Sequence, residues 1–108
     1  MVNFLYVILA GLLAYYFFSL VKKGLDTRDK GRLYERIHVL MEEKKYKETE
    51  ALLAEAVKRF PKDADFNYSL GFIYYSQNLM DNAVKEFRTA VEKEPGHALA
   101  NYSLGHLL

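Results

Sequence analysis

One five-residue sequence occurs twice in this chain, and the interval between its copies constrains the fold more than any other feature. Asn-Tyr-Ser-Leu-Gly fills positions 67–71 and again 101–105, thirty-four residues later. Pro61 and Pro95 are separated by the same interval. A fixed period between about 20 and 50 residues indicates a fold made of stacked copies of one small unit. We therefore expect a repeat protein.

The unit over 64–97 has the pattern of two helices joined by a turn. Its apolar and small residues recur at helical spacing on one face of each helix, Leu70, Gly71 and Tyr74 in the first and Ala83, Phe87 and Ala90 in the second. Gly71 and Ala83 are small enough for the helices to cross closely, and Phe87 fills the space beneath them. Pro95 and Gly96 end the second helix, because the residue before proline avoids the helical region and glycine tolerates positive φ.

These positions resemble the tetratricopeptide repeat, whose pattern is matched by Leu70, Gly71, Tyr74, Ala83, Phe87, Ala90 and Pro95. Asn67 departs from it, because the family usually has Trp or another bulky residue there. The unit over 30–63 is more degenerate, with Ile37 in place of Gly and Thr49 in place of Ala. A third unit begins at Ala98 and covers only its first helix. The resemblance implies an all-α, right-handed solenoid with a concave groove.

The amino-terminal part of the chain has a different composition from the repeats. All 15 Lys and Arg and all 14 Asp and Glu lie at or after Lys22. Twenty apolar residues in a helix span about 30 Å, the thickness of the hydrocarbon core of a bilayer. A cleaved signal peptide is the alternative, but it would need a basic start, a shorter apolar run and a small-residue cleavage site. We predict a transmembrane anchor over 1–23.

Flanking charges predict how this anchor is oriented. Five basic residues follow the apolar run within eleven positions, namely Lys22, Lys23, Arg28, Lys30 and Arg32. The positive-inside rule then places the repeats in the cytoplasm and the amino terminus outside, as a single-pass membrane protein. Ala10, Gly11 and Ala14 form a small-residue patch that would let another membrane helix approach closely. An ordinary lipid-facing helix explains the same three residues.

The expected organisation is an anchor over 1–23, a short linker over 24–29 and a tetratricopeptide domain over 30–108, in repeats 30–63, 64–97 and 98–108. Gly24 is expected to break or loosen the helix after the anchor. The predicted helices cover 2–22, 29–43, 46–59, 64–77, 80–93 and 97–108.

The resemblance also implies which residues face the groove. The positions that carry over include Tyr34, His38, Tyr68, Phe72, Tyr75 and Tyr102, and in the third unit also Leu99, Ser103 and His106. Aromatic side chains bury much area at interfaces, so we expect an apolar helix or extended peptide as partner. Packing inside the repeats is the alternative role for Tyr68, Phe72 and Tyr75. Some family members grip a chaperone carboxylate with Lys, Asn and Arg. Those positions hold Tyr34, His38, Ser69, Leu99 and Ser103 here, so we expect no such docking.

The last eleven residues are unusually apolar for the end of a solenoid. Repeat arrays normally finish with a polar outer helix. Here four leucines, Leu99, Leu104, Leu107 and Leu108, are expected to form a stacking face. We expect either further repeats or a partner to cover it.

Several kinds of chemistry find no support in the sequence. The net charge of +1 gives no basic footprint for nucleic acid. The chain has no cysteine, and His97 and His106 are not spaced as zinc ligands on one helix. No serine has a nearby His and Asp arrangement that would activate it. We expect no catalysis, no metal and no cofactor.

The sequence therefore predicts a membrane-tethered scaffold that recruits or assembles protein partners through an aromatic groove, with membrane lipid around its anchor. The alternative is a structural or accessory subunit of a larger integral membrane complex, for example a respiratory or photosynthetic one. In that case the span would pack on other spans, and the repeats would cap a peripheral surface.

Overall fold

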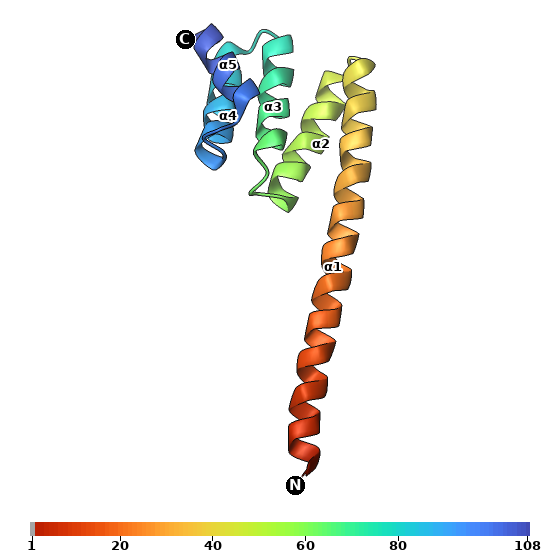
Figure 1. Ribbon diagram of the computed structural model, residues 1–108. Helices are drawn as coiled ribbons and strands as arrows, with labels where there is room; N and C mark the ends of the chain where they lie inside the picture. Colours follow the sequence, from red (N-terminus) through yellow and green to blue (C-terminus); the bar gives the residue numbers. More distant parts are fainter. Residues whose placement is uncertain (1) are drawn as a thin grey trace. The chain divides into compact units, whose positions relative to one another are not determined.

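The computed structural model describes residues 2–108, apart from the side chains of Val2 and Asp26. Over these residues the chain is all helical, as predicted (Figure 1). The helices are α1 (Val2–Glu42), α2 (Tyr46–Arg59), α3 (Ala64–Ser76), α4 (Met80–Lys93) and α5 (Ala98–Leu107). Two compact units divide the chain, the first ending at Glu35 and the second covering Arg36–Leu108.

Helix α1 corrects the prediction of a break at Gly24. The structure has one continuous helix where we expected separate helices over 2–22 and 29–43 with a linker over 24–29 (Figure 1). No proline lies in this stretch to remove a backbone donor. A lone helical glycine costs only about 1 kcal/mol relative to Ala. The Thr27 hydroxyl donates to the Lys23 carbonyl oxygen at 2.9 Å, so this hydroxyl has its hydrogen-bond partner within the helix.

The apolar part of α1 has no packing partner within its own unit. Its large hydrophobic side chains from Phe4 to Val21 are between 44% and 73% exposed. Ala10 and Ala14 are exposed as well, and a Cβ on Gly11 would meet nothing within 4 Å. This helix is long and apolar enough to cross a membrane.

The second unit is built from short helices that pack on one another in chain order, α2 on α3, α3 on α4 and α4 on α5 (Figure 1). Its fully buried side chains include Leu53 from α2, Phe66 and Ile73 from α3, and Phe87 from α4. Burial of apolar area is the main stabilising term for such a stack. The core therefore lies between successive helices, as expected for repeats.

Turns and caps separate these helices close to the predicted positions. Asn78 adopts a φ of 65° in the turn between α3 and α4, a conformation that Asn tolerates better than most residues. The Asp63 carboxylate accepts the backbone N–H of Asp65 at 2.9 Å and caps α3. His97 occupies the matching position of the next repeat and caps α5. Helices α3 and α5 begin at the first residues of the predicted units, Ala64 and Ala98.

Candidate binding groove

A cavity of about 340 Å³ lies between α3 and α5, with α4 contributing to its wall. Most of its lining is aromatic or aliphatic. The lining residues are Tyr68, Phe72 and Tyr75 from α3, Phe87 from α4, and Leu99, Tyr102, Ser103, His106 and Leu107 from α5.

The thirty-four-residue period explains why these side chains meet. On α3, positions 68, 72 and 75 follow the i, i+4, i+7 spacing that places residues on one helix face. On α5, positions 99, 102, 103 and 106 follow the same kind of spacing. Tyr102 is the counterpart of Tyr68 and His106 the counterpart of Phe72. Two neighbouring helices thus turn equivalent faces to one groove.

The Tyr68 ring is less exposed than those of Phe72, Tyr75 and Tyr102. It is half-buried, and its centroid lies 5.6 Å from that of Phe87 and 5.4 Å from that of His97. Tyr68 therefore has a packing role within the repeats as well as a place in the lining.

Other groove side chains are open to solvent. Phe72 is 41% exposed, Tyr75 40% and Tyr102 74%. The Tyr102 ring stacks on His106, with centroids 6.4 Å apart and planes 5° from parallel. Binding is favoured when a partner covers the apolar faces of exposed aromatic side chains such as these.

A sequence profile of the tetratricopeptide repeat matches residues 40–107. The chain belongs to the tetratricopeptide repeat family. No curated protein matches it. The matched region begins near the end of α1 and covers α2 to α5, including every residue that lines the cavity. Tetratricopeptide repeats serve as scaffolds for protein–protein interaction, so the cavity lies in the part of the chain that such a function uses.

The structure brings together four of the six predicted groove residues, Tyr68, Phe72, Tyr75 and Tyr102. Tyr34 and His38 are not among the lining residues. Tyr34 lies half-buried in the first unit. His38 is exposed, and its Nε2 lies 3.3 Å from a carboxylate oxygen of Glu42 on the same helix. The degenerate first repeat therefore adds nothing to this cavity.

Two lining residues were not expected in the groove. Phe87 is 2% exposed and belongs to the core, but part of its ring reaches the cavity. Leu107 is the counterpart of Ile73, which is fully buried in the preceding repeat. The repeat pattern assigns both positions to packing, so it gave no signal that they would line a groove.

The four leucines of the predicted stacking face differ in their relation to the cavity. Leu99 and Leu107 line the cavity, whereas Leu104 and Leu108 do not. Leu104 and Leu108 are one helical turn apart and share the other side of α5. The leucines thus divide between two surfaces, because α5 has an apolar residue on both sides.

Electrostatics in the groove are close to neutral. Among the described residues that line it, none is Lys, Arg, Asp or Glu. The polar atoms come from tyrosine hydroxyls, Ser103 and His106. A carboxylate would find no fixed cation there, whereas an uncharged segment could bury apolar side chains and still form a few hydrogen bonds.

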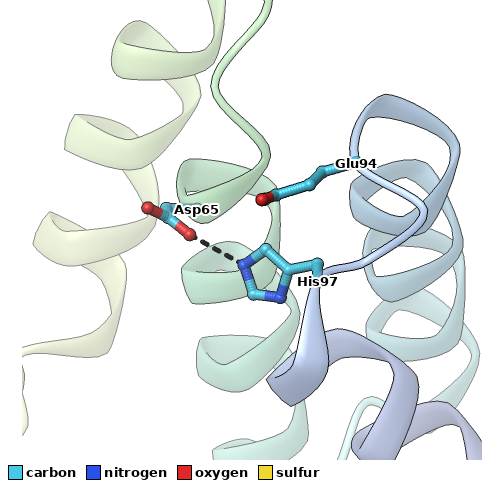
Figure 2. A group of neighbouring side chains, drawn as sticks. All are labelled: Asp65, Glu94 and His97. Carbon is cyan, nitrogen blue, oxygen red and sulfur yellow. Dashed lines mark hydrogen bonds and ion pairs between the residues drawn. The ribbon is translucent and has the colours of Figure 1, made fainter.

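One cluster of possible metal ligands lies outside the groove lining. Donor atoms of Asp65, Glu94 and His97 all lie within 4.8 Å of one another (Figure 2). His97 is 7% exposed, and its Nδ1 accepts the backbone N–H of Ala100 at 3.1 Å. A nitrogen that accepts a hydrogen bond carries no proton, so the neutral ring holds its proton on Nε2. That nitrogen lies 2.7 Å from Asp65 Oδ1 and donates to it.

This arrangement caps a helix and ties two repeats together. A metal bound at Nε2 would displace the proton to Nδ1 and break the cap on α5. The geometry therefore favours a structural role for His97.

Proposed function

We propose that this protein is a membrane-tethered scaffold that binds an uncharged, apolar segment of a partner protein in the groove between α3 and α5. The observation that carries the proposal is the cavity with exposed aromatic walls in the repeat domain. No catalytic step is assigned to it.

The size and chemistry of the groove support this partner class. Binding cavities usually have volumes of about 300 to 1,000 Å³ and are lined mainly by apolar and aromatic groups. Tyrosine is enriched among the residues that dominate binding energy, because it buries a large rigid area and keeps one polar group. The neutral lining favours an uncharged segment, because an ion would lose hydration there without gaining a fixed counter-charge.

The apolar helix supports membrane tethering. Its side chains from Phe4 to Val21 are exposed, and hydrocarbon is a better solvent for them than water. Five basic residues between Lys22 and Arg32 support a cytoplasmic location for the repeats. Protease protection in sealed vesicles tests this orientation. Repeats that are digested from the non-cytoplasmic side would contradict it.

A crosslinking experiment tests the groove. A photo-reactive amino acid in place of exposed Tyr75, in the full chain in its native membrane, should capture a protein by its apolar segment. Phe72→Ala and Tyr102→Ala should weaken this capture, because both side chains line the groove and are exposed. Arg88→Ala, at an exposed position of α4 outside the lining, is the matched control. Capture that survives both groove substitutions would rule out the groove as the binding site.

The second candidate is a structural subunit of a larger integral membrane complex. It is supported by the exposed small-residue patch at Ala10, Gly11 and Ala14, where another helix could approach closely. Purification in mild detergent separates the two functions. Membrane proteins that co-elute in fixed stoichiometry, and are lost with Gly11→Ile, would favour the subunit. Soluble partners in variable amounts would favour the scaffold.

A further inference from the structure

Three tyrosine hydroxyls in the groove lining indicate the conformation of the segment that binds there. They belong to Tyr68 and Tyr75 on α3 and to Tyr102 on α5. None of these hydroxyls has a hydrogen-bond partner within the part of the chain that the structure describes. Tyr74 lies outside the lining, and its hydroxyl donates to Glu50 at 3.0 Å. The three groove hydroxyls are therefore available to a ligand.

A helical partner would use these hydroxyls poorly. The backbone groups of an α-helix bond to one another inside the helix, so its surface offers side chains only. An uncharged, apolar helix face would cover the hydroxyls without giving them a partner, and covering an unpaired polar group costs free energy. The groove chemistry therefore favours a segment whose backbone carbonyls stay accessible.

An ordinary extended segment has accessible carbonyls, but it also brings one N–H group at almost every residue. Extended segments commonly pair these groups with the edge of a sheet. Here the walls are the helices α3, α4 and α5, whose backbone groups bond within the helices. No carboxylate is present among the described lining residues to accept an N–H. Such a segment would bury more donors than the groove can satisfy.

A proline-rich segment in the polyproline II conformation avoids both problems. Proline has no backbone N–H, and this conformation has no internal hydrogen bonds, so its carbonyls remain free to accept. Pro-rich segments dock in grooves lined by aromatic side chains, and Phe72 and Tyr102 are 41% and 74% exposed in this one. The conformation is largely formed before binding, which reduces the entropy lost.

We propose that the partner segment is proline-rich and binds in the polyproline II conformation, with its carbonyls accepting hydrogen bonds from the hydroxyls of Tyr75 and Tyr102. This inference rests on the proposed function of the groove and names the class of segment that it binds. Since no described lining residue is Asp or Glu, the segment needs no Arg or Lys beside its prolines.

Synthetic peptides test the proposal. The probe is a fluorophore-labelled oligoproline of about nine residues, which is about 28 Å long in this conformation. Titration with the full chain in mild detergent should give saturable fluorescence anisotropy. A proline-free peptide of the same length, made of Ala, Val and Thr, should bind about tenfold or more weakly. Absence of saturable binding by oligoproline, or equal binding by both peptides, would overturn the proposal.

Protein variants test the role of the hydroxyls. Tyr75→Phe and Tyr102→Phe keep the rings and should each weaken oligoproline binding about twofold to tenfold, the equivalent of one hydrogen bond. Tyr102→Ala removes the ring as well and should weaken binding further. Arg88→Ala, at an exposed position outside the lining, should have no effect. Circular dichroism should show the same helix content in all four variants. If both Phe variants bind oligoproline as tightly as the natural chain, the hydroxyls do not select the segment and the proposal fails.

A stapled helical peptide of Leu, Ala and Gln separates this inference from the proposed function. If it binds as tightly as oligoproline or more tightly, and Phe72→Ala and Tyr102→Ala remove this binding, the groove function stands and the proline-rich class is wrong. If none of the peptides binds, and capture by the photo-reactive group at Tyr75 also survives both substitutions, the proposed function fails together with this inference.

Discussion

Gly71 and Phe87 are packed so closely that a side chain at Gly71 has no room. A Cβ at this position would lie 2.7 Å from two carbons of the Phe87 ring, and real Cβ atoms essentially never lie that near another atom. Phe87 is 2% exposed, and the same Cβ would lie 3.2 Å from the carbonyl oxygen of Ala83, which belongs to the α4 backbone. The crossing of α3 and α4 therefore depends on a glycine for its lack of volume and not for its backbone freedom.

Gly71→Ala should destabilise the repeat domain by about 1–3 kcal/mol, the usual cost of overpacking a core. Gly105→Ala is the matched control, because it changes the same motif at a helical position whose Cβ would meet nothing within 4 Å. That control should be neutral or stabilising by up to about 1 kcal/mol. Urea unfolding of the full chain in mild detergent, followed by circular dichroism, measures both. Equal effects at the two glycines would show that the crossing tolerates expansion.

Asn67 offers a second comparison between the repeats. Its buried amide donates to Glu86 and accepts from Lys93, so it joins α3 to two positions of α4. Asn67→Ala should cost about 1–3 kcal/mol, because these partners lose a buried hydrogen-bonding group. Asn101→Ala, at the exposed counterpart, should cost less in the same unfolding experiment. A larger loss at Asn101 would contradict the view that burial sets the importance of this side chain.

The helical hairpins could be predicted because each of their signals is local. Pro61 and Pro95 mark the turns, and Gly71, Ala83 and Phe87 mark one close crossing. The continuity of α1 was mispredicted from Gly24. A glycine weakens a helix by only about 1 kcal/mol, which neighbouring helix-forming residues overcome, and no proline supports a stop there. A single glycine is therefore a weak signal for a linker.

The groove was harder to predict than the fold. The resemblance to the tetratricopeptide repeat predicted that Tyr68, Phe72, Tyr75 and Tyr102 share one groove, and all four line the cavity. It could not show that Leu107 would reach the cavity. The repeat pattern assigns this position to packing, because its counterpart Ile73 is fully buried in the preceding repeat.

The hydroxyl of Tyr74, at the contact between α2 and α3, should make the free energy of unfolding depend on pH. Burial, together with the hydrogen bond that its hydroxyl donates to Glu50 at 3.0 Å, raises the pKa of Tyr74 above its ordinary value of 10.0. The folded state thus holds this proton more tightly than the unfolded state. The resulting stabilisation is present below pH 10.0 and is lost as pH rises through the folded pKa.

Tyr74→Phe isolates this contribution from that of the other tyrosines. In neutral buffer the variant should be less stable than the natural chain by about 0.5–1.5 kcal/mol, the net value of one hydrogen bond. Above pH 10.0 the difference should shrink, because only the natural chain then loses a proton at this site. Urea unfolding on both sides of that pH measures it. A difference that stays constant would mean that the Glu50 contact does not control the proton.

The two hydrogen bonds of the His97 ring determine what its replacement costs and how the site responds to metal ions. Its Nε2 donates to Asp65 (Figure 2), and its Nδ1 accepts the backbone N–H of Ala100 and caps α5, so both ring nitrogens are used. His97→Ala should cost about 1 kcal/mol for the lost cap, and more for the lost contacts with Asp65 and Tyr68. His97→Asn should recover part of this loss, because its side-chain oxygen can cap the helix as Asp63 caps α3.

Zinc should leave the unfolding midpoint of the natural chain unchanged, since binding at Nε2 of His97 would require the proton to move to Nδ1 and break the cap. A midpoint that rises with zinc in the natural chain, and fails to rise in both His97→Ala and Glu94→Gln, would instead identify Asp65, Glu94 and His97 as metal ligands.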